Sequence, residues 1–151
     1  MSWQTSIQTA DAITSKYLKL KSGESAEVIF LGEPEHSIQC YDTEENKGVK
    51  YDPMIHDGDP RYNVTTKWLI NVATLPKLTP QVFQCGVSLF RELAIEFQKG
   101  RIAKCTYEIS REGESKNTKW KLRRENDITA EQKEALKIVE LHPLDSDDFP
   151  F

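Results

Sequence analysis

Residues 61 to 75, RYNVTTKWLINVATL, are the stretch that most constrains the fold of this chain. β-Branched and aromatic residues dominate the stretch, and residues of this kind recur at every second position. Such alternation is typical of a strand with one buried face. The stretch therefore predicts a long central strand, with one face formed by Tyr62, Val64, Thr66, Trp68, Ile70 and Val72.

Shorter segments before and after this stretch also have strand patterns. The sequence KYLKLKSGESAEVIFLG predicts a hairpin or a bent first strand around a turn at residues 22–24, and HSIQCYD predicts a short strand. Residues 101–126 predict two more strands around a polar turn at 113–117. Residues 42–60 are polar, contain two prolines and two glycines, and lack a hydrophobic period, so we expect a long loop there.

Two helices are expected. In LTPQVFQCGVSLFRELAIEFQKG, Thr79 is the predicted N-cap, Pro80 takes the first helical position, and Gly100 ends the helix. Its apolar stripe comprises Phe83, Val87, Phe90, Leu93, Ala94 and Phe97. In DITAEQKEALKIVE, a capping box of Thr129 and Gln132 predicts a short second helix.

This order of elements predicts a mainly β protein with a five-stranded Greek-key barrel, the OB-fold, and one helix between strands 3 and 4. A short C-terminal helix and a disordered acidic tail follow. We expect an OB-fold domain over residues 1–126, the short helix over 127–140 and the tail over 141–151. A length of 151 residues suits one domain with a hydrophobic core.

The sequence also bears on the compartment in which the protein works. It has no run of about 20 apolar residues and no signal-peptide layout at its start. Its three cysteines, Cys40, Cys85 and Cys105, are widely spaced and odd in number, which favours reduced thiols. We therefore expect a cytoplasmic protein that does not bind membranes.

Charge is unevenly distributed along the chain, although the net charge is only -4. Residues 61–124 carry thirteen lysines and arginines against five acids, whereas residues 1–60 carry five lysines against eleven acids. Residues 125–151 carry two lysines against eight acids. A basic middle between acidic ends favours an anionic partner for the middle segment.

Single-stranded nucleic acid lies across open faces of such barrels, with its bases stacked on aromatic rings and its phosphates near basic side chains. The basic segment contains both residue types. On residues 118–124, Lys119, Lys121 and Arg123 should share one face, with Trp120 and Leu122 on the other. The predicted nucleic-acid-binding residues are Arg61, Tyr62, Lys67, Trp68, Lys104, Tyr107, Lys119, Trp120, Lys121 and Arg123, with Tyr41 and Tyr51 as alternative stacking residues.

The chain ends in DSDDFPF, where acidic residues lead to an apolar tip. Acidic residues keep such a segment solvated, so its two phenylalanines are available to another surface. This ending resembles the C-terminal tip of single-stranded-DNA-binding proteins. YLKLKSGESAEVIFLGEPE and RYNVTTKWLINVATLPKLTP are similar to the first and central strands of phage-encoded members. Together these segments cover 46 of the 151 residues, about three tenths of the chain.

The resemblance implies an OB-fold that coats single-stranded DNA during phage replication, recombination and repair. It also implies a tail that recruits replication or recombination proteins, such as a polymerase or helicase, with the terminal phenylalanine in an apolar pocket of the partner. The corresponding tail residues are Asp145, Asp147, Asp148, Phe149, Pro150 and Phe151. We expect a monomer or homodimer, no cofactor, and competition between the acidic tail and DNA.

Other interpretations of the sequence are less well supported. Related phage proteins carry a zinc-binding insertion after the second strand, but here only His36, Cys40 and His56 lie there, without a paired-cysteine motif, so we expect no metal. The acidic loop with Asp52, His56, Asp57 and Asp59 could be drawn as a magnesium site of a nuclease, but solvated turn residues explain it better. We find no catalytic motif and expect no enzyme. The alternative is a replisome or recombination adaptor that does not bind DNA itself.

Overall fold

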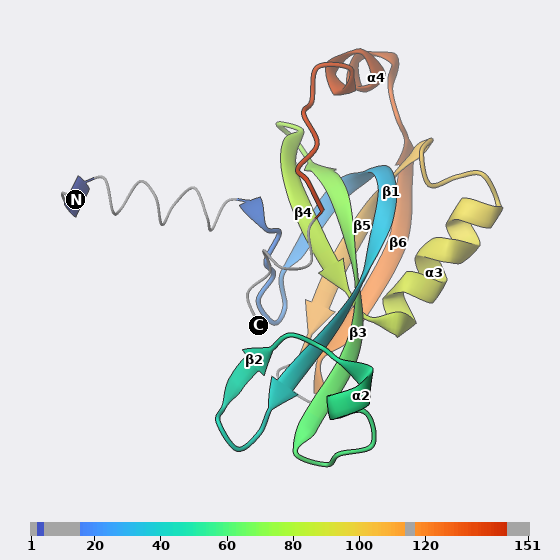
Figure 1. The fold of residues 1–151 in the computed structure, drawn as a ribbon. Coiled ribbons are helices and arrows are strands. Elements are labelled where there is room, and N and C mark those ends of the chain that lie inside the picture. Colours follow the sequence, from blue (N-terminus) through green and yellow to red (C-terminus); the bar gives the residue numbers. More distant parts are fainter. Residues whose placement is uncertain (1–2, 5–15, 114–116, 145–151) are drawn as a thin grey trace.

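Six strands and three helices, α2 to α4, make up the part of the chain that the computed structural model describes, residues 3–4, 16–113 and 117–144 (Figure 1). The elements are β1 (Ser25–Asp42), β2 (Lys47–Val49), α2 (Pro53–His56), β3 (Tyr62–Thr74), β4 (Thr79–Cys85), α3 (Val87–Gln98), β5 (Cys105–Glu112), β6 (Lys119–Asp127) and α4 (Ala130–Leu136). The prediction of a mainly β protein is confirmed. Within the described ranges, no helix is long and apolar enough to cross a membrane.

All six strands belong to one antiparallel sheet with the order β4-β3-β1-β5-β6, and β2 pairs with the far end of β1. The predicted number of five strands is therefore wrong. Strands β2 and β4 form in segments that were expected to be a loop and part of a helix, and residues 36–42, expected as a separate short strand, are the end of β1. In the described part of the chain, β4 and β6 are the sheet edges and are not paired with each other, so the sheet is not closed.

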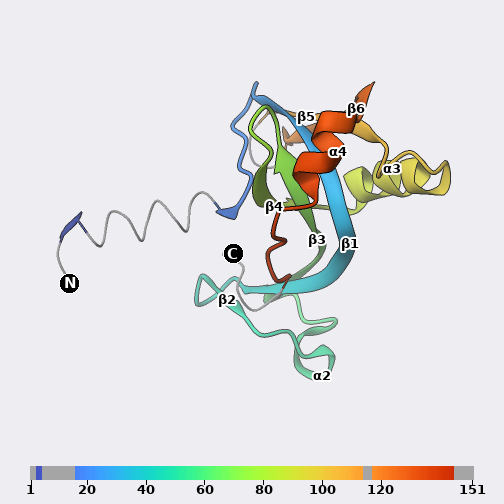
Figure 2. The same cartoon turned by 90° about the horizontal axis from the view of Figure 1, so that it is seen from above.

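Strand β1 is long and pairs with β3 in two different registers along its length. Residues 28–31 pair with residues 71–74 of β3, and residues 35–42 pair with residues 62–69 after a register shift between Leu31 and Glu35. A bulge of this kind bends a strand and increases its twist, and Figure 2 shows the resulting curve of β1. We call residues 35–68, which extend beyond the bend and carry β2 and α2, the arm.

The predicted start of the main helix is wrong. Residues 79–85 form strand β4, and α3 begins at Val87 with Gly86 as its N-cap. Seven residues of β4 pair in register with β3, which buries Val82 on one face of the sheet and Phe83 on the other. Proline lacks a backbone N–H donor. Pro80 is tolerated here because β4 is an edge strand, in which not every backbone donor is needed for pairing.

The main core lies between the curled sheet and α3. Phe83 on β4 and Trp120 on β6 are in ring contact at 5.7 Å, so the two edge strands approach each other across this core. Leu89 and Leu93 of α3 are buried against it. Of the predicted helical stripe, Phe97 instead lies 70% exposed.

The other face of the sheet is covered by the C-terminal part of the chain (Figure 2). Helix α4, which has the predicted capping box, places Leu136 against Ile29 and Ala73. Beyond α4, the chain continues over β3 and β4, where Leu144 packs on Leu69. Residues 141–144 of the predicted tail are therefore held against the sheet.

One predicted turn is confirmed, and the strands on either side of another are found. The turn at residues 22–24 is closed by a hydrogen bond from the Glu24 amide to the Lys21 carbonyl, with Gly23 at a φ of 84°. Strands β5 and β6 pair antiparallel as predicted, and residues 114–116 of the turn predicted between them lie outside the described residues. Before the first turn, however, the expected strand is not formed, and Tyr17 is in an isolated parallel bridge to Val82.

Candidate nucleic-acid interface

The ten residues predicted to bind nucleic acid lie in three separate places. Arg61 and Tyr62 are at the tip of the arm, and Lys67 and Trp68 are at its base. The remaining six lie in or near β5 and β6, which β1 separates from β3 in the sheet: Lys104, Tyr107, Lys119, Trp120, Lys121 and Arg123. They do not form one continuous surface.

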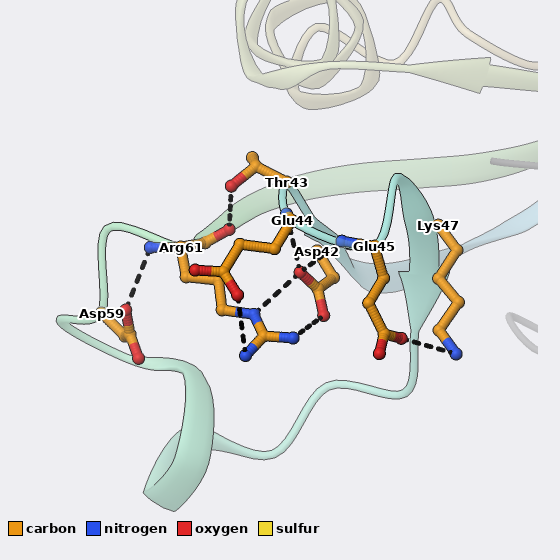
Figure 3. A network of polar contacts seen from close by, with 7 residues as sticks. All are labelled: Asp42, Thr43, Glu44, Glu45, Lys47, Asp59 and Arg61. Carbon is orange, nitrogen blue, oxygen red and sulfur yellow. Dashed lines mark hydrogen bonds and ion pairs between the residues drawn. The ribbon is translucent and has the colours of Figure 1, made fainter.

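At the tip, Arg61 is held by acidic side chains (Figure 3). Its Nε and Nη2 atoms donate to the two carboxylate oxygens of Asp42 at 2.9 and 2.8 Å, and its Nη1 atom lies 3.3 Å from Glu44 Oε2. The hydrogen bonds from Arg61 are the main reason that the pKa of Asp42 falls to about 2. In this conformation, the Arg61 guanidinium holds the two ends of the loop together and is not free to bind a phosphate.

Tyr62 also serves the packing of the tip. Its ring makes an edge contact at 4.4 Å with His56, the buried last residue of α2, which accepts a hydrogen bond at Nδ1 from the Asp52 amide. The tip instead exposes apolar side chains of α2, because Met54 is 93% and Ile55 is 59% exposed. Stacking of a base on Tyr62 would require α2 to move.

At the base of the arm, Trp68 belongs to a row of three rings. Its indole stacks on Phe90 of α3, with ring centroids 4.4 Å apart and planes 5° from parallel. On β1, the ring of His36 lies 5.1 Å from Trp68 and is exposed. The row is packed against the core at one end and ends in an exposed aromatic ring at the other, which is the kind of surface on which a base can stack.

Lys67 reaches the start of α3 from the other face of β3. Its Nζ atom would lie 3.7 Å from a Cβ atom at Gly86, the N-cap of α3. This cap has no side-chain hydrogen bond, so backbone N–H groups at the helix start lack a side-chain partner there. An ammonium group next to such a helix start is a suitable environment for a phosphate.

The arm carries a continuous polar strip beside Lys67. The register pairs Ser37 with Lys67, Gln39 with Thr65, and Tyr41 with Asn63, and these six residues share one face of the two strands. Tyr41 is 37% exposed and provides a ring on this face. The rings that end at His36 lie on the opposite face of the same two strands. We call the strip and Lys67 on one face, together with the row of rings on the other face, the arm-base site.

On β6 the predicted division of faces is confirmed, but the charges are partly neutralised. Lys119, Lys121 and Arg123 are exposed, whereas Trp120 and Leu122 pack against the core. The Lys121 ammonium lies 3.4 Å from Glu112, and Arg123 lies 3.4 Å from Glu108 and also bonds Glu125. This strand therefore presents a mixed rather than a strongly basic surface.

Tyr107 was wrongly predicted as a residue available for stacking. It is fully buried, with its ring 5.6 Å from Phe30, and its hydroxyl donates to Glu96 at 3.2 Å. Burial, followed by the nearby Glu96 carboxylate, raises the pKa of the Tyr107 hydroxyl. Trp120 is half-buried, between Phe83 and the Arg111 guanidinium. Lys104 is exposed on the loop before β5.

The residues considered for metal or nuclease chemistry have structural contacts. Asp52 caps α2, and Asp57 accepts a hydrogen bond from the Tyr51 hydroxyl at 2.7 Å, which raises the pKa of Tyr51 to about 12. Across residues 3–4, 16–113 and 117–144, no group of three metal-ligating side chains is found. The three cysteines are buried and unpaired, and burial raises the pKa of Cys85 to about 12.

The C-terminal segment is attached close to the arm-base site. Asn71 donates to the His142 carbonyl at 3.0 Å and accepts from the His142 amide at 2.9 Å, while His142 Nε2 lies 3.0 Å from the Pro80 carbonyl. Leu144 packs on Leu69, which lies two residues from Lys67 on the same face of β3. The acidic and aromatic tail residues, 145–151, lie outside the described residues.

Sequence reasoning missed the contribution of His36, which had been considered only as a metal ligand. Its position opposite Trp68 depends on the register between β1 and β3, so local sequence provided no signal for it. Comparison of the chain with protein-family models, curated proteins and solved structures finds no match. The function must therefore be argued from the chain itself.

Proposed function

We propose that this protein binds single-stranded DNA with little sequence preference and that the arm-base site is central to binding. The single observation that carries the proposal is that the base of the arm has, on one face, a lysine ammonium next to an uncapped helix start and, on the other face, a row of rings that ends in exposed His36. Phosphates would bind near Lys67, and bases would stack on the exposed rings.

The strand order supports an OB-fold interpretation. Strand β1 lies between β3 and β5, and α3 connects β4 to β5, which is the arrangement expected of that fold when short β2 is set aside. The bent β1 and the approach of the two edge strands across the core favour a barrel-like form. We propose the OB-fold class on these grounds.

The tail completes the proposal. We infer that residues 145–151 recruit replication or recombination proteins in the cytoplasm, which for a phage protein is that of the host. Burial of one phenylalanine supplies about 2 to 3 kcal/mol, and each exposed ion pair adds about 1 kcal/mol or less, so partners would bind reversibly. Because Leu144 lies near Lys67, the acids that follow it would compete with DNA phosphates. Neither enzymatic activity nor a cofactor is part of this proposal.

Fluorescence anisotropy of labelled oligo-dT tests the proposal. The full chain and a chain ending at Leu144 would be titrated across a salt series, with duplex DNA as the control. Leu144 is retained so that its packing on Leu69 stays intact. We expect preference for the single strand, weaker binding at high salt because counterions are released, and stronger binding without the tail.

Two substitutions locate the binding surface. Lys67→Gln and His36→Ala should each weaken binding, whereas Lys133→Gln, on the exposed side of α4, is the matched control. If neither substitution at the arm-base site changed the affinity, the site assignment would be wrong. If no form of the chain bound oligo-dT, DNA binding itself would be refuted.

The second candidate function is that of an adaptor without DNA binding. The observation in its favour is the exposure of Met54 and Ile55 at the tip of the arm, where apolar side chains are available to a protein partner. Absence of oligo-dT binding by both chain lengths would favour this function.

A further inference from the structure

An apolar cavity of about 600 Å³ lies between α3 and the bend of β1. It lies where β1 shifts its register with β3 between Leu31 and Glu35 and bends, while α3 stays packed on the core. Among the described residues that line it, Glu33 is the only charged one. The walls are formed mainly by Phe30, Gly32, Ile70, Phe90, Ala94 and Phe97.

We propose that this cavity binds the Phe-Pro-Phe end of the same chain, residues 149–151. The proposed occupant has the right chemistry, because two phenyl rings and a proline suit an apolar cavity of this size. This docking would keep the tip from other proteins until a partner competes for it. Docking of the tip requires no nucleic acid, so its test does not depend on whether the protein binds DNA.

The C-terminal segment passes close to the cavity. A Cβ atom at Gly32, which lines the cavity, would lie only 3.1 Å from Leu141 Cδ1. The chain is held against the sheet as far as Leu144, which packs on Leu69, the neighbour in β3 of the cavity-lining Ile70. Phe149 follows Leu144 by five residues, and an extended chain of that length spans up to about 18 Å. A sphere of the cavity's volume is roughly 10 Å across, so this length of chain exceeds the width of the cavity.

Charge at the rim supports the same occupant. Arg101 and Lys104 flank two lining residues, Ile102 and Ala103, at one end of the cavity. Lys104 is exposed, and Arg101 is 3.7 Å from Glu96. The acidic residues of the tail directly precede the aromatic tip, so carboxylates would reach the basic rim when the rings enter the cavity.

A peptide of residues 144–151 carrying a fluorescent label tests the docking by anisotropy. The chain ending at Leu144 should bind it at least tenfold more tightly than the full chain, because the attached tail occupies the cavity at an effective concentration of about millimolar. A peptide with Phe149→Ala and Phe151→Ala should bind at least tenfold more weakly. Ala94→Trp, which fills the cavity, should cause a similar loss, whereas Arg91→Trp on the exposed part of α3 is the matched control.

Amide NMR shifts of the full and shortened chains provide a test that does not depend on Ala94→Trp folding. Removal of the tail should shift the signals of Gly32, Ala94 and Ala103 and leave that of Lys121 on β6 unchanged. Shifts confined to the polar strip of the arm, or no shifts at all, would overturn the proposal. Shifts that depend on protein concentration would also overturn it, because the occupant would then come from a second copy.

Discussion

Replacing Asn71 with alanine should release residues 141–144 from the sheet while leaving the strands paired. The Asn71 side chain is 5% exposed, and its amide makes two hydrogen bonds with the backbone of His142, at 2.9 and 3.0 Å. Both hydrogen bonds join the Asn71 side chain to the C-terminal segment, and neither belongs to the backbone ladder between β3 and β4. The substitution therefore tests how the start of the tail is held in place.

The cost of Asn71→Ala follows from the contacts it removes. Each neutral hydrogen bond contributes about 1 kcal/mol net, so we expect the free energy of unfolding to fall by about 2 kcal/mol. A chain ending at Glu140 loses the same two bonds, the His142–Pro80 contact and the half-buried Leu144, for a total of about 3 to 4 kcal/mol. If Asn71→Ala and the truncation remove the same two hydrogen bonds, their effects should not add. The free energy of unfolding of the combined variant should then fall by about 2 kcal/mol less than the sum of the two separate decreases.

Urea denaturation of the four chains measures this coupling, provided that the m-values agree. Amide hydrogen exchange gives a second readout, because His142 should lose its protection in the Asn71→Ala chain. Additive costs, within about 0.5 kcal/mol, would show that Asn71 stabilises the sheet by some route other than the C-terminal segment.

Three further predictions follow from the same structure. Lys67→Gln should reduce the slope of log affinity for oligo-dT against log salt by about 0.7, whereas Lys121→Gln, already paired with a glutamate, should change it less. Tyr107→Phe should lower the free energy of unfolding by about 1 kcal/mol in urea titrations, because Glu96 loses a hydrogen bond from the buried hydroxyl; an unchanged value would contradict that bond. Asp42 has a pKa of about 2 in the fold against its ordinary 3.8, so its stabilising contribution is complete above about pH 4 to 5 and is lost as pH falls toward 2. The melting temperature of Asp42→Asn should therefore fall less steeply in that range than that of the unchanged chain.

Much of the secondary structure was predictable because its signals are local. The capping box at Thr129 and Gln132, the turn at Gly23 and the alternation along β6 each depend on a few neighbouring residues, and each is found in the fold. Strand β4 was mistaken for the first turns of a helix. Over seven residues, an apolar pattern fits both structures, and pairing with β3 is what decides between them.

The candidate site was predictable only in part. Lys67 and Trp68 were found from the sequence, and their opposite faces follow from strand geometry. Whether a basic residue is free depends on distant partners, and the local sequence gave no sign that Asp42 would hold Arg61. His36 is placed beside Trp68 by a register shift in β1, which is also a long-range feature.

The sequence by itself determined the mainly β composition, the β5–β6 strand pair, the helix cap and the acidic aromatic end, because these depend on residue type and short spacing. The tertiary structure decided which apolar segment became an edge strand, which rings are buried and which charges are neutralised. It also formed the cavity beside α3, since a bend in one strand and the packing of a helix create it together. The physical reason is that burial and charge pairing depend on contacts between residues far apart in the chain, whereas propensity acts only between near neighbours.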